Sequence, residues 1–249
     1  MSSNRFKRNY DFSLKEKKDF LITTSVLTLV FFFLFSRISW MNQEATIFLV
    51  VSKIIILWLI TALILFMMIF IAKKTAIKKA YTAKYSAWKN GLFIGFVISF
   101  ISYGFLPLLF PGLITINRIE RLRHGKLFPG ENTKHISFIL IMVFFYLFIT
   151  TIISQLLFFI FKVELFYYFA TIAALIAAFS ALPFNNNIGL HLFRVNKQKY
   201  FFVLFFSILL AVFVLLKMIL ALVFAVLGTM LIYFLTKKLI SKFLIPNKK

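Results

Sequence analysis

The chain has 249 residues, of which 62% are apolar and only 14% are charged, and its formal net charge is +22. Its mean hydropathy of +0.96 excludes a soluble globular domain, which has about 45–50% apolar and about 25% charged residues, and a disordered chain, which contains few hydrophobic residues. Because the chain has no cysteine, the sequence also excludes disulfides, thiolate zinc sites and a cysteine nucleophile.

Long apolar stretches fill most of the chain, and a membrane span needs about 17–25 mainly apolar residues. Residues 1–19 are polar and basic, and we expect a cytoplasmic N-terminal segment in which Ser13-Leu14-Lys15-Glu16 resembles a capping box that begins a helix. Residues 20–236 are expected to form a single transmembrane domain, and residues 237–249 a basic cytoplasmic tail. The expected segments of the domain are 20–36, 45–72, 91–116, 136–161, 165–184, 200–216 and 218–236, with a turn at Lys217 between the last two.

The segment 91–116 has an unusual composition. It holds four of the eight glycines and two of the five prolines, and both residue types weaken a continuous helix. Two interpretations fit this composition. The segment is either a re-entrant segment, which enters the membrane and returns to the same side, or an ordinary kinked helix.

The distribution of the basic residues favours re-entry under the positive-inside rule. If all seven segments span the membrane, its two sides receive 14 and 15 lysines and arginines; if 91–116 is re-entrant, they receive 25 and 4. Re-entrant backbone has to be buried in protein rather than exposed to lipid. We therefore expect an all-α polytopic protein of the cell membrane with about six transmembrane helices plus a re-entrant or kinked segment, and with both termini in the cytoplasm.

The ionisable residues offer little chemistry inside the membrane. All seven acidic residues lie outside the expected segments, whereas pumps and proton-coupled carriers usually have ionisable residues within theirs. On a soluble chain the basic excess would indicate nucleic-acid binding, but no basic run here is interleaved with stacking aromatic residues. We therefore expect the lipid bilayer as a partner, no nucleic acid, and no soluble small-molecule substrate that the sequence identifies.

Two groups of polar residues are candidates for a site. The first group is the three histidines, His124, His135 and His191. None of them belongs to an HExxH motif. They form a metal site in one interpretation, and His191 is an interfacial or capping residue in the other. A second group follows Pro183: Asn185, Asn186, Asn187 and Gly189. This group lines a polar cavity in one interpretation and ends the preceding helix in the other.

The order of several short motifs resembles archaeal site-2 protease-like membrane proteins, which are relatives of intramembrane zinc metalloproteases. The motifs extend over nearly the whole chain: Asp11–Glu16, Ile71–Lys74, Ala83–Trp88 with Gly91-Leu92, Pro111–Ile116, Gly125–Leu127 and Leu182–Phe193. Ile71–Lys74 is similar to the residues that follow the family's HELAHK motif, and Leu182–Phe193 is similar to its LPIPPLDGSKVF ligand segment. The resemblance implies a site-2 protease-like core whose element after the zinc-binding helix stays at the cytoplasmic membrane face.

The resemblance also implies that the metal site is lost. The family's two metal histidines fall on Ile64 and Met68, its general base on Leu65, and its third ligand, an aspartate, on Ile188, which precedes the retained Gly189. A hydrolytic zinc site needs three protein ligands and an activated water, but the side chains at these positions are apolar. We therefore expect no catalytic residue and no cofactor, although the related proteins bind zinc.

Three functions stay open at this point. The first is a non-catalytic pseudoprotease that binds membrane-protein partners or their transmembrane helices. The second is a transporter or channel subunit with a polar cavity near residues 183–191. The third is an active intramembrane metalloprotease with an unconventional ligand set drawn from His124, His135 and His191.

Overall fold

A computed structural model describes residues 12–36, 47–118, 133–184 and 186–217, and within these ranges the protein is mostly helical. Five of the described helices are long and apolar enough to cross a membrane, the pattern of a multi-pass membrane protein. These helices are α2 (Leu14–Ser36), α3 (Ile47–Lys78), α5 (Thr133–Phe161), α6 (Glu164–Ala181) and α8 (Lys197–Leu215). The other described elements are the short helices α4 (Lys89–Ile101) and α7 (Ile188–Val195) and the strands β1 (Tyr81–Ser86) and β2 (Leu113–Arg118).

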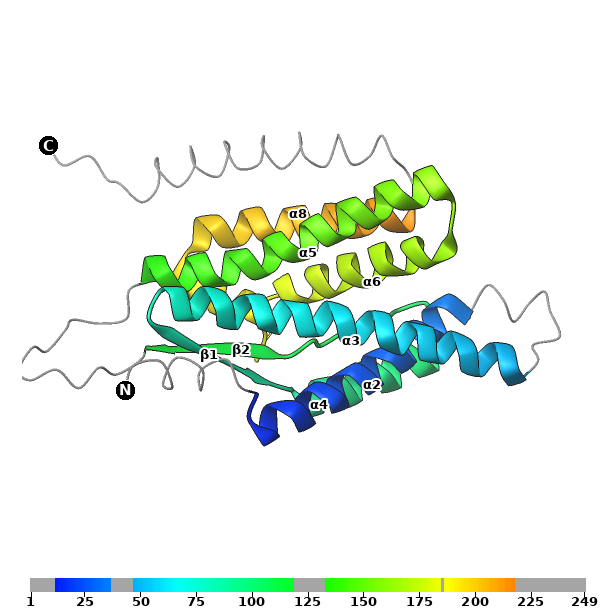
Figure 1. Cartoon of the computed structure of the whole chain (residues 1–249), viewed down its shortest axis with the longest axis horizontal. Coiled ribbons are helices and arrows are strands. Elements are labelled where there is room, and N and C mark those ends of the chain that lie inside the picture. The colour runs from blue at the N-terminus through cyan, green and yellow to red at the C-terminus, as the bar shows by residue number, and fades with distance from the viewer. Residues whose placement is uncertain (1–11, 37–46, 119–132, 185, 218–249) are drawn as a thin grey trace, which may run out of the picture.

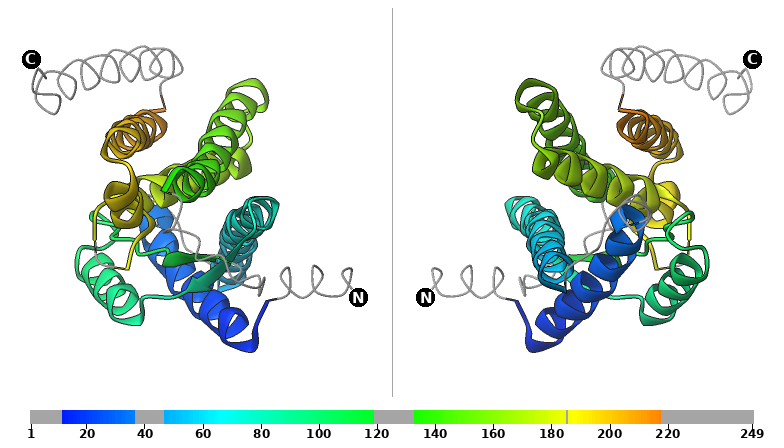
Figure 2. Two further views of the ribbon diagram at one scale, coloured as in Figure 1. Left: turned by 90° about the vertical axis from the view of Figure 1, so that its left-hand side faces the viewer. Right: turned by 90° about the vertical axis from the view of Figure 1, so that its right-hand side faces the viewer.

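Helix α3 is central to the arrangement (Figure 1). It packs against α2 on one side and against α5 and α6 on the other. In the end-on views of Figure 2, α2 lies between α3 and α4. The helices α7 and α8 pack against α6, and α7 also contacts α5. One continuous cluster of buried hydrophobic side chains receives residues from every described helix and from both strands.

The first described helix begins at the predicted capping box. The Ser13 amide donates to Glu16 Oε2 at 2.9 Å, and the Glu16 amide donates to Ser13 Oγ at 3.2 Å. These two bonds satisfy amide groups that have no partner inside the helix. Helix α2 therefore begins at Leu14, within the polar segment that precedes the apolar residues 20–36.

Helix α3 continues through residues 73–78, which include three lysines, and thus extends beyond the expected apolar segment 45–72. Lysine is a good helix former, so the change in composition does not stop the helix. Lys73 is also buried, because its ammonium group meets a carboxylate of α2. At Lys73 the chain therefore stays helical and buried, where the charge in the sequence suggests a solvated loop.

The segment 91–116 does not form one continuous helix. Helix α4 has 13 residues and ends at Ile101, which makes it about 20 Å long at 1.5 Å per residue, shorter than the hydrocarbon thickness of about 30 Å. Just beyond it, Gly104 has a φ of +78°, and a Cβ there would lie 2.6 Å from the Phe33 carbonyl carbon of α2. Glycine therefore permits both the left-handed turn and the close approach to α2.

The all-α prediction missed a two-stranded sheet. The strands β1 and β2 pair antiparallel, with Tyr81 opposite Arg118 and Ser86 opposite Leu113. The chain thus leaves the sheet at the end of β1, forms α4, and returns beside its point of departure. A re-entrant segment would have both ends side by side in this way, and re-entry into a membrane stays a prediction. The number of spans and the sidedness of the sheet stay predictions.

Three further boundaries define the rest of the fold. Lys162 has a φ of 55° in the short connection between α5 and α6. Helix α8 ends at Leu215, and Lys217, where the sequence predicts a turn, has a φ of 53°. Residues 188–195, which lie between the expected segments 165–184 and 200–216, form α7. The expected segment 218–236 and the tail 237–249 lie outside the described residues.

Candidate functional site

The four positions that register on the family's metal site are fully buried. Ile64, Leu65 and Met68 lie on α3, and Ile188 is the first residue of α7; each has an exposed fraction of 0%. All four belong to the same hydrophobic core. Their side chains offer neither an imidazole nor a carboxylate, so this part of the core has no group that could hold a hydrolytic zinc ion.

Asn187 closes the end of α6. Its Nδ2 donates to the carbonyl oxygens of Phe179 at 2.6 Å and Leu182 at 3.2 Å, and the Phe179 carbonyl also accepts the amide of Leu182 at 3.3 Å. These bonds supplement the few backbone partners that carbonyls have at the end of a helix. Asn186 is exposed, and Asn185 lies outside the described residues. In the structure, this asparagine run therefore supplies a helix cap, and the polar cavity stays a prediction.

Gly189 has a packing role. A Cβ at this position would overlap the carbonyl oxygen of Ala181, so only glycine lets the first turn of α7 lie directly against the end of α6. This contact, together with the Asn187 cap, fixes the place of Ile188 in the core.

Two of the three candidate histidines lie in the described part of the chain, and the metal site that would use all three stays a prediction. His135 lies on α5 with its ring centroid 6.3 Å from that of Tyr81. His191 is half-buried on α7, and His124 lies outside the described residues. No group of three histidine, cysteine, aspartate or glutamate residues among those described is placed to hold a metal ion.

A buried ion pair joins α2, α3 and β1. The Lys73 ammonium lies 3.0 Å from Glu16 Oε2, and their side chains have exposed fractions of 3% and 7%. The other carboxylate oxygen, Oε1, accepts the amide of Tyr85 at 3.0 Å. Glu16 thus caps its own helix, pairs with a cation of α3 and binds the backbone of β1. The sequence analysis identified the cap and missed the other two partners, because both are distant along the chain.

Tyr85 extends this network to the returning part of the chain. Its hydroxyl donates to the carbonyl of Pro111 at 2.7 Å and lies 2.9 Å from Thr23 Oγ1 of α2. Burial raises the pKa of the Tyr85 hydroxyl well above its ordinary value, so it stays protonated and can act as the donor. The strand, the loop before β2 and α2 are therefore held together by one side chain.

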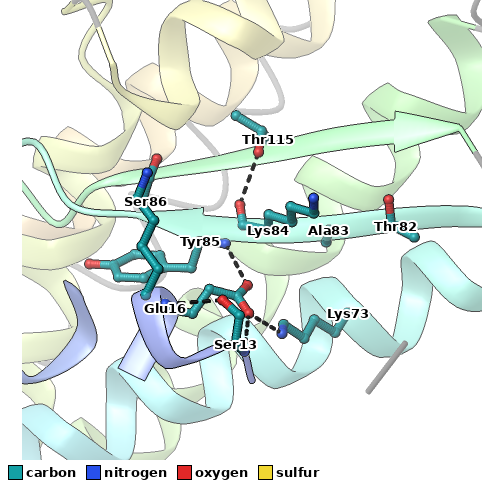
Figure 3. A pocket seen from close by; sticks show the side chains of 10 residues that line it. Ser13, Glu16, Lys73, Thr82, Ala83, Lys84, Tyr85, Ser86 and Thr115 are labelled. Carbon is teal, nitrogen blue, oxygen red and sulfur yellow. Dashed lines mark hydrogen bonds and ion pairs between the residues drawn. The ribbon is translucent and has the colours of Figure 1, made fainter. Parts of the chain in front are cut away.

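A pocket of about 460 Å³ lies beside this ion pair. Figure 3 shows it between β1 and the beginning of α2, with Lys73 of α3 alongside. Among the described residues, three lysines and one carboxylate line it together with hydroxyl groups. These lining residues are Ser13, Lys15, Glu16, Lys73, Thr82, Ala83, Lys84, Tyr85, Ser86 and Thr115. We refer to it as the lysine pocket.

The two outer edges of the sheet differ. Because the Tyr85 amide donates to Glu16, it points away from β2, and the amide of Ala87 is likewise bound by Asp19 Oδ2 at 3.4 Å. Helix α2 therefore covers the outer edge of β1. In an antiparallel pair, two directly opposite residues either both point their backbone N–H and C=O groups toward the other strand or both point them away from it. Ile114 lies opposite Tyr85, so its backbone groups face the outer edge of β2.

The outer edge of β2 has no partner strand in the described structure. Ile114, and Ile116 opposite Ala83, present their backbone groups there, and no hydrogen bond from another described residue reaches those groups. Both residues are buried, backbone included, with exposed fractions of 1% and 4% for the whole residue, so other parts of the protein already cover this edge. An unpaired strand edge thus lies beside the protein core.

Gln155 of α5 is a further residue that the sequence analysis missed. It has an exposed fraction of 0%, and neither its Oε1 nor its Nε2 has a hydrogen-bond partner among the described residues. A polar side chain in a membrane helix is commonly a contact to another helix. Its presence inside the apolar segment 136–161 was a signal in the sequence that could have identified it.

A scan against protein-family models, a search of curated proteins and a search of solved structures each found no match. The resemblance to site-2 protease-like proteins therefore stays a prediction, and the chain is described by its architecture: a mostly helical membrane protein with five helices that could span a membrane among its described residues.

Proposed function

We propose that the protein is a non-catalytic membrane protein that binds a partner membrane protein through the outer edge of β2. In this proposal an extended segment of the partner, next to one of its transmembrane helices, displaces what covers this edge and pairs with the backbone of Ile114 and Ile116, which are 1% and 4% exposed. The observation that carries the proposal is the absence of a hydrogen-bonding partner for this edge among the described residues.

The physical basis is the cost of backbone groups that lack partners near a membrane. Unpaired amide and carbonyl groups are costly where water is scarce. An added strand satisfies them, and its main-chain hydrogen bonds supply affinity without a demand for a particular sequence. On the outer edge of β1, Glu16 binds the amide of Tyr85, and Asp19 binds the amide of Ala87, one residue beyond the strand.

The absence of catalysis in this proposal rests on the apolar positions. Ile64, Leu65, Met68 and Ile188 are packed in the core with exposed fractions of 0%. Hydrocarbon and thioether groups in such a position neither hold zinc nor lower the pKa of a bound water. A bound partner would therefore stay intact.

A photo-crosslinking side chain placed at Asn117, which is exposed on β2, tests the proposal in native membranes. We expect an adduct with a full-length membrane protein, attached near the end of one of its transmembrane helices. Replacing Ile116 by proline removes the outward amide while edge strands tolerate proline, so Ile116→Pro should abolish the adduct. The matched change Ile116→Val keeps the amide and should retain it.

Two results would contradict the proposal. One is an adduct of equal yield in Ile116→Pro, provided that the thermal unfolding of this variant matches that of Ile116→Val. The other is an adduct whose partner is shortened at the bound segment, because that result indicates proteolysis rather than binding alone.

A further inference from the structure

We propose that the lysine pocket binds the phosphate group of an anionic phospholipid. The charge of its lining provides the first reason. Glu16, the only carboxylate among the described lining residues, pairs with Lys73 at 3.0 Å. Lys15 and Lys84 also line the pocket and are exposed, and no carboxylate of the described residues forms an ion pair with either. Within the described structure, the pocket therefore keeps two cations that no carboxylate pairs with.

The existing hydrogen bonds explain why an anion rather than a cation suits this pocket. The carboxylate oxygens of Glu16 accept from Lys73, from the amide of Tyr85 and from the amide of Ser13. These bonds occupy the acidic group, so it is poorly placed to hold a further positive charge. The flexible lysine side chains, in contrast, can turn their ammonium groups toward a phosphate oxygen.

An apolar surface adjoins the pocket and indicates a lipid rather than a soluble phosphate. The Lys73 ammonium lies 4.1 Å from the ring centroid of Phe12, and that ring stacks on Phe66 with a centroid separation of 5.7 Å. Phe66 is 42% exposed and lies two helical turns before Lys73 on α3, about 10 Å away along the axis. A headgroup in the pocket would thus place its acyl chains beside Phe66.

The expected sidedness agrees with this ligand. The positive-inside distribution places residues 73–90, which include β1 and Lys84, at the cytoplasmic face. Anionic lipids give the cytoplasmic leaflet its negative surface potential, and basic pockets between membrane helices bind their headgroups. This inference does not depend on the partner bound at β2.

The test uses the full chain in detergent and counts bound phosphatidylglycerol and phosphatidylcholine by native mass spectrometry. We expect phosphatidylglycerol to bind more tightly, and binding to weaken as ionic strength rises. Removing both free cations with Lys15→Ala and Lys84→Ala should weaken phosphatidylglycerol binding by about 30-fold. The control Lys89→Ala with Lys199→Ala removes two exposed lysines that do not line the pocket and should leave binding unchanged.

Three outcomes would overturn the inference. Equal loss of binding in the control and pocket variants would mean that the overall charge, not the pocket, attracts the lipid. Unchanged binding in the pocket variant would remove the site. If glycerol 3-phosphate, a headgroup without acyl chains, competes as well as phosphatidylglycerol, the pocket takes a soluble phosphate and not a lipid.

Discussion

Replacing Lys73 by methionine should destabilise the protein strongly, because it leaves the carboxylate of Glu16 buried without its cation. The two side chains are 3.0 Å apart and have exposed fractions of 3% and 7%. Methionine keeps much of the volume and the helix propensity of lysine. The change therefore removes the charge with little disturbance of the packing around α3.

The expected magnitude follows from the partners that Glu16 keeps. Breaking a buried pair by removing one partner costs about 3–5 kcal/mol. The amides of Tyr85 and Ser13 still donate to the carboxylate, so we expect the lower end, about 3 kcal/mol. For a chain of this size that loss corresponds to a fall in the unfolding temperature of about 6–12 °C.

Thermal unfolding of the purified protein in detergent measures this effect. Lys74→Met is the matched control, because Lys74 is the exposed neighbour on the same helix and its loss should change stability by no more than about 0.5 kcal/mol. The double variant Glu16→Gln with Lys73→Met removes both charges and should recover much of the loss. The reasoning is refuted if Lys73→Met is as stable as Lys74→Met, or if the double variant is less stable than either single variant.

Three further changes test other contacts by the same unfolding measurement. Gly189→Ala should destabilise by about 1–3 kcal/mol, because its Cβ would overlap the Ala181 carbonyl; wild-type stability would contradict the close packing of α7 on α6. Tyr85→Phe should cost about 1–3 kcal/mol, because it leaves the buried carbonyl of Pro111 without its donor; a neutral effect would contradict that bond. Gln155→Met should leave stability unchanged or raise it by about 1–3 kcal/mol, because the amide lacks a described partner; a loss of stability would show that the amide is bound.

Local patterns predicted the apolar helices well, because long runs of apolar residues have few other ways to be buried. The capping box at Ser13 and Glu16 and the turn at Lys217 were also readable from neighbouring residues. The burial of Lys73 on α3 was not readable, because its partner Glu16 lies 57 residues away along the chain. Non-local partners of this kind leave no mark in a local window of sequence.

The sheet and the candidate site were harder to predict. Buried and more exposed residues alternate along β1, Tyr81–Ser86. In the sequence, Tyr81, Ala83 and Tyr85 alternate with polar residues, and such alternation is a signal for a strand. Its short length and its place in a basic stretch concealed that signal. The lysine pocket and the free edge of β2 arise from pairing of segments more than 25 residues apart, so composition gave no indication of either. The apolar side chains of Ile64, Met68 and Ile188, in contrast, are read directly from the sequence, whereas their registration on a metal site stays a prediction.

The return of the chain to the side from which it entered is the central claim, because the sheet, its free edge and the lysine pocket all depend on it. Single cysteines at Lys84 and Asn117 measure it directly, since the chain has no cysteine of its own and both residues are exposed. The account predicts that an impermeant maleimide labels both variants in inside-out vesicles and neither in right-side-out vesicles. Labelling of the two positions from opposite sides of the membrane would contradict it.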